Sequence, residues 1–127
     1  MVDALRGVVV VAVEDDPDGL ALLQLVMEHD GALVVPASDA SSALDTLRRM
    51  RPTILVTDLS MPSHDGIWLV TEARRAGLLT DVPAVLLTAF TMTQQEVREA
   101  GFDAYLQKPV DPTALRGTLR ALCHHAA

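Results

Sequence analysis

Short apolar runs alternate along the sequence with longer stretches in which apolar residues recur at helical spacing. Five of the runs have the length and β-branched content of strands, and three are apolar throughout, as strands buried on both faces are. The predicted strands are residues 8–13, 33–35, 54–57, 84–87 and 104–106. This alternation predicts an α/β fold in which crossover helices connect the strands of a parallel sheet.

Polar residues and prolines mark where three of the five predicted helices begin. An acidic N-cap followed by proline, or a Thr followed three residues later by Glu, satisfies the free backbone N–H groups of a first helical turn. The predicted helix starts are Asp16-Pro17, Thr93 with Glu96, and Asp111-Pro112. Gly31, Gly77 and Gly101 follow helical stretches and are expected to cap their C-terminal ends.

Length and composition agree with one globular domain. The 127 residues suffice for one core, and no repeat or linker divides them, so residues 1–127 are expected to form a single domain with its core at about 8–123. Half of the residues are hydrophobic and 21% are charged. Only 3% are aromatic, so the core is expected to be aliphatic.

Charge and cysteine content exclude several classes of protein. Ten basic and seventeen acidic side chains give a net charge of −7, which disfavours binding to a nucleic-acid backbone. The single cysteine, Cys123, allows no intrachain disulfide and indicates a reducing compartment. The first apolar run is too short to span a membrane and is followed at once by acids, unlike a signal peptide. A cytoplasmic protein without a membrane span is therefore expected.

Chemically active side chains follow four of the predicted strands. Glu14 and Asp15 come after the first strand, Asp58 after the third, Thr88 after the fourth and Lys108 after the fifth. In a parallel sheet the carboxyl ends of the strands lie along one edge, which is where such folds bind ligands. The five side chains are therefore expected to form one site.

The types of these residues point to phosphoryl transfer. Glu14, Asp15 and Asp58 can supply the oxygen ligands that Mg²⁺ prefers, and without a cation their charges would repel one another. Asp58 can then act as a carboxylate nucleophile toward phosphorus. Lys108 can neutralise one phosphoryl oxygen, and the Thr88 hydroxyl can donate a hydrogen bond to another.

Each of these residues also has an ordinary structural explanation. The acidic segment at 14–16 can be a solvated turn, Asp58 a turn residue, Thr88 a buried hydroxyl and Lys108 the exit from a strand. Their joint occurrence at successive strand ends favours a shared site over four separate coincidences. Asp16, beside Pro17, is assigned to helix capping rather than to the site.

Four motifs resemble those of the receiver domains of two-component response regulators, including chemotaxis-type single-domain regulators and the receivers of hybrid histidine kinases. They are VEDDP at 13–17, TDLSMP at 57–62 with DG at 65–66, LTA at 87–89 and YLQKP at 105–109. The resemblance extends over residues 8–123. Glu14 stands where this family often has an aspartate, and the charge is the same.

The resemblance implies a doubly wound (βα)5 fold with a five-stranded parallel sheet in the flavodoxin-like order 2-1-3-4-5. It also implies that Asp58 accepts a phosphoryl group from a histidine kinase or a histidine phosphotransfer protein in a phosphorelay. Mg²⁺ would be held by Glu14, Asp15, Asp58 and the backbone carbonyl of Ser60. Lys108 and Thr88 would complete the catalytic set.

The resemblance further implies a switch. Phosphorylation would draw Thr88 toward the phosphoryl group and move Tyr105 inward. This would alter the face formed by the fourth helix, the fifth strand and the fifth helix, through which a protein target binds. A phosphorylation-dependent homodimer is left open. Such a protein catalyses its own phosphorylation and dephosphorylation but turns over no separate substrate.

Two other classes of protein share parts of the pattern. A phosphatase with an aspartate nucleophile normally carries a second aspartate two residues later as its general acid, whereas this chain has Ser60 there and no cap domain. A nucleotide- or flavin-binding module would need a Gly-rich loop after the first strand, and the acids at 14–16 would repel a phosphate instead. Both alternatives are therefore disfavoured.

Overall fold

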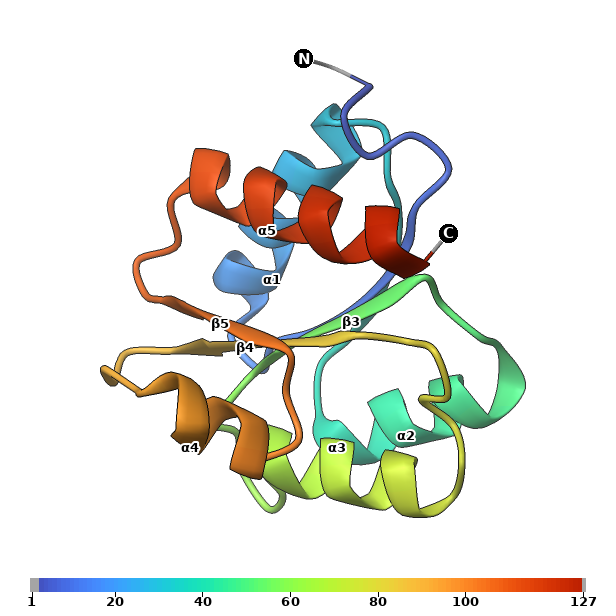
Figure 1. Ribbon diagram of the computed structural model, residues 1–127, viewed down its shortest axis with the longest axis vertical. Coiled ribbons are helices and arrows are strands. Elements are labelled where there is room, and N and C mark those ends of the chain that lie inside the picture. The colour runs from blue at the N-terminus through green and yellow to red at the C-terminus, as the bar shows by residue number, and fades with distance from the viewer. Residues whose placement is uncertain (1–2, 127) are drawn as a thin grey trace.

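A five-stranded parallel sheet lies between two layers of helices in the computed structural model, which describes the backbone of residues 3–126 and the side chains of residues 3–123 (Figure 1). The strands are β1 Val9–Val13, β2 Leu33–Ala37, β3 Ile54–Asp58, β4 Ala84–Thr88 and β5 Ala104–Gln107. Their order across the sheet is β2-β1-β3-β4-β5. The predicted fold class and strand order are thus confirmed.

A helix follows each strand in the sequence. The helices are α1 Pro17–His29, α2 Ala40–Arg49, α3 Gly66–Arg75, α4 Gln94–Glu99 and α5 Pro112–Ala126. Figure 1 shows α1 and α5 on one face of the sheet and α2, α3 and α4 on the other. Within residues 3–126, none of these helices has the length and apolarity that crossing a membrane requires.

The two faces of the sheet bury alternate residues of each strand, as the period-2 geometry of a strand requires. Val10 and Ala12 of β1 join the core under α1 and α5, whereas Val11 and Val13 join the core under α2, α3 and α4. All four side chains are fully buried, which explains why the central strands read as continuous apolar runs.

The predicted helix caps are present. Asp16 Oδ2 accepts a hydrogen bond of 3.1 Å from the amide of Gly19, and Thr93 with Glu96 forms a complete capping box. Asp111 Oδ2 accepts a bond of 3.0 Å from the amide of Ala114 in α5. The glycines expected to end helices have positive φ angles; they are Gly31, Gly77 and Gly101.

Four strands, β2, β3, β4 and β5, extend further than the sequence pattern predicts. β3 includes Asp58 and β4 includes Thr88, because backbone pairing continues past the point where apolar side chains stop. β2 continues through Pro36, which an edge strand tolerates because one side of it has no neighbouring strand to receive a hydrogen bond. The nucleophile candidate is therefore fixed within the sheet and does not lie in a loop.

Candidate functional site

The carboxyl ends of four strands bring the predicted residues together. Glu14 directly follows β1, Asp58 and Thr88 are the last residues of β3 and β4, and Lys108 directly follows β5. Asp58 pairs in register with Leu87, so the nucleophile candidate and Thr88 lie on neighbouring strands.

Three carboxylates form a cluster at this edge. One oxygen each from Glu14, Asp15 and Asp58 lies within 4.8 Å of the other two. Glu14 and Asp58 are nearly buried, with 3% and 6% exposure, whereas Asp15 is exposed. The cluster therefore has a buried inner part and one side open to solvent.

Lys108 is the cation of the site. Its Nζ lies 2.8 Å from Oε2 of Glu14 and 3.1 Å from Oδ1 of Asp58. Burial alone would lower the pKa of Lys108, but hydrogen bonds to Glu14 and Asp58, together with their negative charge, outweigh burial and raise this pKa above its ordinary value. The ammonium therefore stays charged at neutral pH and joins the two buried carboxylates.

The second oxygen of Glu14 is also engaged. Its Oε1 accepts a hydrogen bond of 3.2 Å from the backbone amide of Asp16, whose own carboxylate caps α1. The backbone amide of Asp16 thus orients Glu14, while the Asp16 side chain caps α1. The sequence-based separation of Asp16 from Glu14 and Asp15 agrees with this geometry.

The charges of the site fit a divalent cation. Lys108 compensates one of the three negative charges, which leaves two. An oxygen-only donor set with a water-accessible side is what Mg²⁺ prefers. Glu14, Asp15 and Asp58 could hold such an ion, and the Ser60 carbonyl accepts none of the hydrogen bonds described within residues 3–126, so its lone pairs are available as well.

Thr88 and Tyr105 are connected through one loop. Thr88 Oγ1 accepts a hydrogen bond of 3.1 Å from the amide of Phe90, and the Tyr105 hydroxyl accepts one of 3.3 Å from the amide of Met92. Both amides belong to the segment between β4 and α4. A displacement of Thr88 can therefore reach Tyr105 through this short stretch of backbone.

Gly66 is a site residue that only the structure explains. Its amide donates a hydrogen bond of 2.9 Å to the Leu59 carbonyl, and a Cβ added at Gly66 would lie 2.4 Å from the carbonyl oxygen of Asp58. No side chain fits there without moving the backbone of the nucleophile candidate. The DG motif at 65–66 was the available signal in the sequence, but it gave no reason for the glycine.

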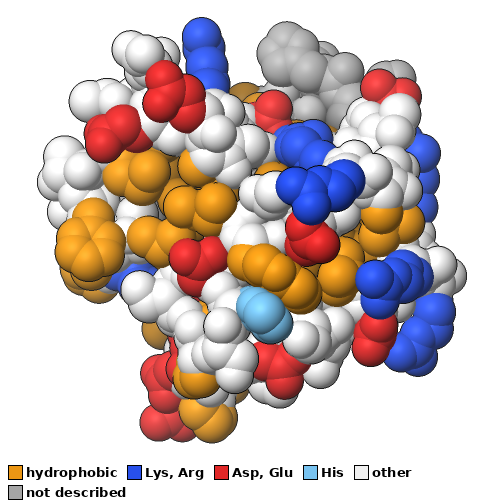
Figure 2. Space-filling view, turned by 90° about the horizontal axis from the view of Figure 1, so that it is seen from below, with side chains coloured by type: hydrophobic (Ala, Val, Ile, Leu, Met, Phe, Trp, Pro, Cys, Tyr) orange, Lys and Arg blue, Asp and Glu red, His pale blue; other side chains and the backbone are white. Residues whose placement is uncertain are grey.

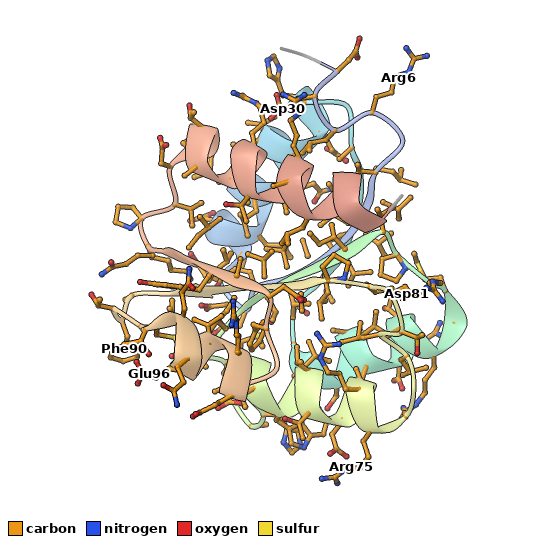
Figure 3. The ribbon with its side chains drawn as sticks, viewed as in Figure 1. Arg6, Asp30, Arg75, Asp81, Phe90 and Glu96 are labelled. Atoms are coloured by element: carbon orange, nitrogen blue, oxygen red, sulfur yellow. The ribbon has the colours of Figure 1, made fainter. Side chains whose placement is uncertain are left out.

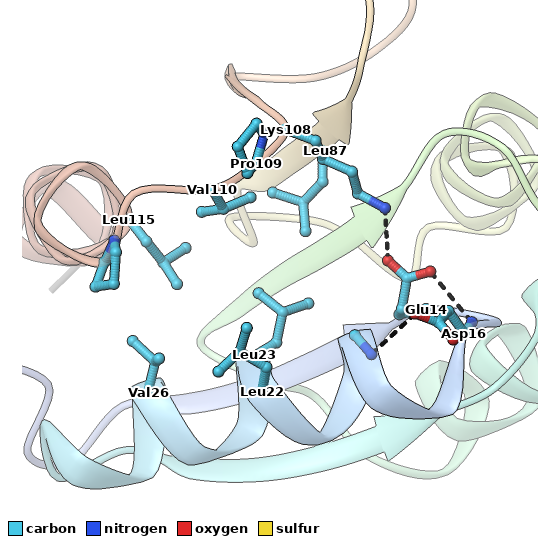
Figure 4. A pocket seen from close by; sticks show the side chains of 12 residues that line it. Glu14, Asp16, Leu22, Leu23, Val26, Leu87, Lys108, Pro109, Val110 and Leu115 are labelled. Atoms are coloured by element: carbon cyan, nitrogen blue, oxygen red, sulfur yellow. Dashed lines mark hydrogen bonds and ion pairs between the residues drawn. The ribbon is translucent and has the colours of Figure 1, made fainter.

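An apolar groove opens beside the site (Figure 4). It has a volume of about 540 Å³ and runs between α1 and the segment that leads from Lys108 into α5. Lys108 and Glu14 form its polar end, and Leu22, which is 62% exposed, lies on its α1 wall. The sequence analysis missed this groove because it arises only where α1 and α5 meet.

The opposite face carries a different surface. Figure 2 looks onto α2, α3 and α4, where hydrophobic side chains gather toward the α4 side, and Lys and Arg side chains toward the other. Phe90, which lies near α4 in Figure 3, is 63% exposed. Half-buried Met92 and Tyr105 pack against the core on this side.

The family model and the sequence relatives point to the same protein family. The family model described as the response regulator receiver domain matches residues 10–120. The uncharacterized 14.6 kDa protein of the sodA1 3′ region in Leptolyngbya boryana is 38% identical over 90% of this chain and 88% of its own length. PhoB, a phosphate regulon transcriptional regulatory protein of Escherichia coli, is 30% identical over 89% of this chain, which spans only 50% of PhoB.

Solved structures agree with the sequence relatives. The chemotaxis protein CheY4 of Vibrio cholerae superposes with a TM-score of 0.84 at 26% identity, covering 91% of this chain and 98% of CheY4. The receiver domain of the sensor histidine kinase PA1611 of Pseudomonas aeruginosa gives a TM-score of 0.85 at 26% identity, covering 94% and 99%. That structure is described as having a magnesium ion coordinated in its active site cleft. Fold, motifs and relatives together show that this chain belongs to the receiver domains of two-component response regulators.

Proposed function

We propose that this protein is a phosphorylatable switch in which Asp58 accepts a phosphoryl group from a histidine kinase or a histidine phosphotransfer protein. The observation that carries the proposal is the position of the Asp58 carboxylate, nearly buried, 3.1 Å from the Lys108 ammonium and within the acidic cluster. No other described aspartate combines a cation, neighbouring acids and a strand-end position in this way.

The transfer is a displacement at phosphorus. A carboxylate oxygen of Asp58 forms a bond to phosphorus as the bond from phosphorus to the donor's imidazole nitrogen breaks, and the imidazole leaves with that electron pair. Mg²⁺, when bound by Glu14, Asp15 and Asp58, supplies positive charge that neutralises the phosphoryl oxygens. Lys108 pairs with one peripheral oxygen and orients the acceptor carboxylate.

Thr88 converts this reaction into a conformational change. Its hydroxyl already accepts a hydrogen bond from Phe90 and has its proton left to donate to a phosphoryl oxygen. Moving toward that oxygen pulls the loop that also bonds Tyr105 through Met92. Tyr105 then turns inward, and the face formed by α4, β5 and α5 changes shape.

This face is the proposed output surface for a protein target, and the same face would serve a homodimer formed on phosphorylation. Family membership supports a signalling role over a turnover enzyme. Ser60 lies two residues after Asp58, where a phosphatase would place its general acid, and so adds to this support. We place the reaction in the cytoplasm, on the basis of the single cysteine and the acidic, soluble composition.

Intact-mass measurement tests the phosphoacceptor. The wild-type protein, incubated with Mg²⁺ and acetyl phosphate, is expected to gain the mass of one phosphoryl group, and Asp58→Asn none. Asp45→Asn is the matched control, because Asp45 is an exposed aspartate on α2 whose one ion pair among the described residues is with Arg48. A folded wild-type protein that binds Mg²⁺ but gains no phosphoryl mass would overturn the proposal, as would an Asp58→Asn variant that gains as much as wild type.

A further inference from the structure

Thr57 is a buried polar side chain to which the proposed reaction gives no role. It lies in β3 directly before Asp58 and is fully buried, as are the apolar residues that precede it in the strand. Its hydroxyl donates a hydrogen bond of 3.0 Å to the backbone carbonyl of Asp58. Burying a hydroxyl costs free energy that an apolar side chain of the same shape would not cost. The position of this hydroxyl, one residue before the nucleophile candidate, therefore calls for an explanation.

The peptide group that follows Asp58 is held at both of its polar ends. Its N–H, which belongs to Leu59, donates a hydrogen bond of 2.8 Å to the Leu87 carbonyl of β4. Its C=O, which belongs to Asp58, accepts the hydrogen bond from Thr57. None of the backbone hydrogen bonds of turns, loops and caps within residues 3–126 ends on this carbonyl oxygen. Because a peptide group is planar, these two contacts together fix its orientation.

The surroundings of this carbonyl leave little that could replace the hydroxyl. A Cβ added at Gly66 would lie 2.4 Å from the Asp58 carbonyl oxygen and 3.3 Å from Cγ2 of Thr57, so the start of α3 packs directly against both groups. Asp58 is only 6% exposed, so solvent has little access to it. Without the Thr57 hydroxyl, the carbonyl would lose a donor in a place where an unpaired polar group is costly.

We propose that Thr57 is a positioning residue, whose hydroxyl holds the Asp58 carbonyl and so fixes the direction in which the Asp58 carboxylate leaves the strand. The inference rests on the proposed function of Asp58 and adds a residue that supports it. A peptide group that turns to find another donor changes the backbone angles on both sides of it. The Asp58 side chain and the Ser60 carbonyl would both shift, and a displacement of about 1 Å is enough to slow an aligned displacement reaction severely.

Two substitutions separate the hydroxyl from the space that Thr57 fills. Thr57→Val keeps the shape and removes the hydroxyl, whereas Thr57→Ser keeps the hydroxyl and removes the methyl group. Phosphorylation by acetyl phosphate, at saturating donor and Mg²⁺, is followed by intact mass. The rate is expected to fall at least about fivefold in Thr57→Val and to stay within about twofold of wild type in Thr57→Ser. A residue that only fills space would give the opposite order.

A second pair guards against a Thr57→Val protein that folds poorly. Thr57→Ala and Thr57→Ser both lack the methyl group, and only the serine has a hydroxyl. The alanine variant is expected to be phosphorylated at least about fivefold more slowly than the serine variant. The matched control is Thr46→Val on α2, which removes a hydroxyl that donates to the Ser42 carbonyl outside the site. Its phosphorylation rate is expected to equal that of wild type.

Amide hydrogen exchange tests the same contact without any phosphoryl chemistry. The Leu59 amide belongs to the peptide group that Thr57 holds, and the Val11 amide in the centre of the sheet serves as a reference for global opening. The exchange rate of Leu59 relative to that of Val11 is expected to rise at least about fivefold in Thr57→Val or Thr57→Ala. In Thr57→Ser this ratio should stay near that of wild type.

An unchanged exchange ratio in the variants without a hydroxyl would overturn the inference. So would folded variants without a hydroxyl that are phosphorylated as fast as Thr57→Ser. These outcomes are distinct from failure of the proposed function. A wild-type protein that gains no phosphoryl mass loses the function, and the exchange ratio still decides whether Thr57 holds the Asp58 backbone. A wild-type protein that is phosphorylated at a rate independent of the Thr57 hydroxyl keeps the function and loses the positioning role.

Discussion

Arg116 of α5 forms an ion pair with Asp30 at the end of α1, with Nε 2.9 Å from Oδ2. Asp30, labelled near the top of Figure 3, is only 1% exposed, and its Oδ1 has no hydrogen-bond partner among the described residues. The carbonyl of Asp30 also accepts a bond of 2.7 Å from the Leu5 amide. This pair ties α5, α1 and the N-terminal segment together at the end of the groove away from Lys108.

The first prediction concerns this pair. Arg116→Met leaves a buried carboxylate without its cation, and the free energy of unfolding is expected to fall by about 3 kcal/mol. Adding Asp30→Asn in that background is expected to recover part of the loss, because a neutral amide costs less to bury than a charge. Urea denaturation of the three proteins measures both effects. A loss below about 0.5 kcal/mol in Arg116→Met would contradict the assignment.

A second prediction follows from the crowding at Gly66. Gly66→Ala would push its methyl group to 2.4 Å from the Asp58 carbonyl oxygen, so the strand end must shift, and stability is expected to fall by about 2 kcal/mol or more. The rate of phosphorylation should fall with it, because Asp58 moves. The matched control is Gly117→Ala in α5, where a Cβ meets no atom within 4 Å.

Gly117→Ala is expected to raise stability by about 0.5–1 kcal/mol, since alanine favours a helix interior over glycine. Thermal unfolding and intact-mass time courses compare the two variants. A Gly66→Ala protein as stable and as readily phosphorylated as wild type would contradict the prediction. It would show that the loop after β3 can shift to accommodate the added methyl group at little cost.

A third prediction separates metal binding from signalling. Lys108→Ala should still bind Mg²⁺, because Glu14, Asp15 and Asp58 remain, but phosphorylation should no longer rearrange the output face. In ¹H–¹⁵N NMR spectra, the shifts that phosphorylation causes around Tyr105 in wild type are expected to be lost. Identical phosphorylation-induced shifts in the variant would rule out a part for Lys108 in the switch.

A fourth prediction uses the N-cap of α2. Asp39 Oδ1 accepts a hydrogen bond of 2.7 Å from the amide of Ser42, and this bond lowers the pKa of Asp39 below 3.8. The unfolded chain therefore binds more protons near that pH, and the stability contributed by Asp39 is present above 3.8 and lost as the pH falls through the lower, folded-state pKa.

Asp39→Asn caps a helix about as well but does not titrate. The stability difference between wild type and this variant is expected to change between about pH 5 and pH 2, with wild type losing more. Urea midpoints measured across that range provide the check. Parallel curves for the two proteins would mean that the cap contributes no pH dependence.

A fifth prediction concerns the exposed acid of the cluster. Mg²⁺ that binds only the folded protein should stabilise it by about 2.7 kcal/mol at one hundred times its Kd. Asp15→Asn should weaken this stabilisation, whereas the stability measured in the absence of Mg²⁺ should hold or rise slightly, because the exposed Asp15 makes no ion pair among the described residues and its charge repels Glu14 and Asp58. Asp18→Asn, an equal change of charge in the first turn of α1, should keep the full effect.

Local signals explain why much of this arrangement was predictable. The apolar runs predicted where the strands lie, and the Asp-Pro pairs predicted where two helices begin, because both signals depend on residues that are neighbours in the sequence. The ends of β3 and β4 were predicted one residue too early. Asp58 and Thr88 are polar, so the apolar pattern stops before them although the backbone pairing continues.

Other features could not be read from the sequence. Arg116 and Asp30 are 86 positions apart, and nothing near either residue indicates its partner. The groove beside Lys108 and the crowding at Gly66 likewise depend on where α1, α5 and β3 meet in space. Sequence patterns predicted the residues of the candidate site, whereas their contacts required the assembled sheet.

The order of the site residues along the chain has a consequence for synthesis. Glu14, Asp15 and Asp58 emerge from the ribosome before Lys108, which arrives only with the last strand. A nascent chain that ends before β5 would gather three like charges at the sheet edge without their lysine. This edge of the sheet therefore gains its neutralising cation only after β5 has been made.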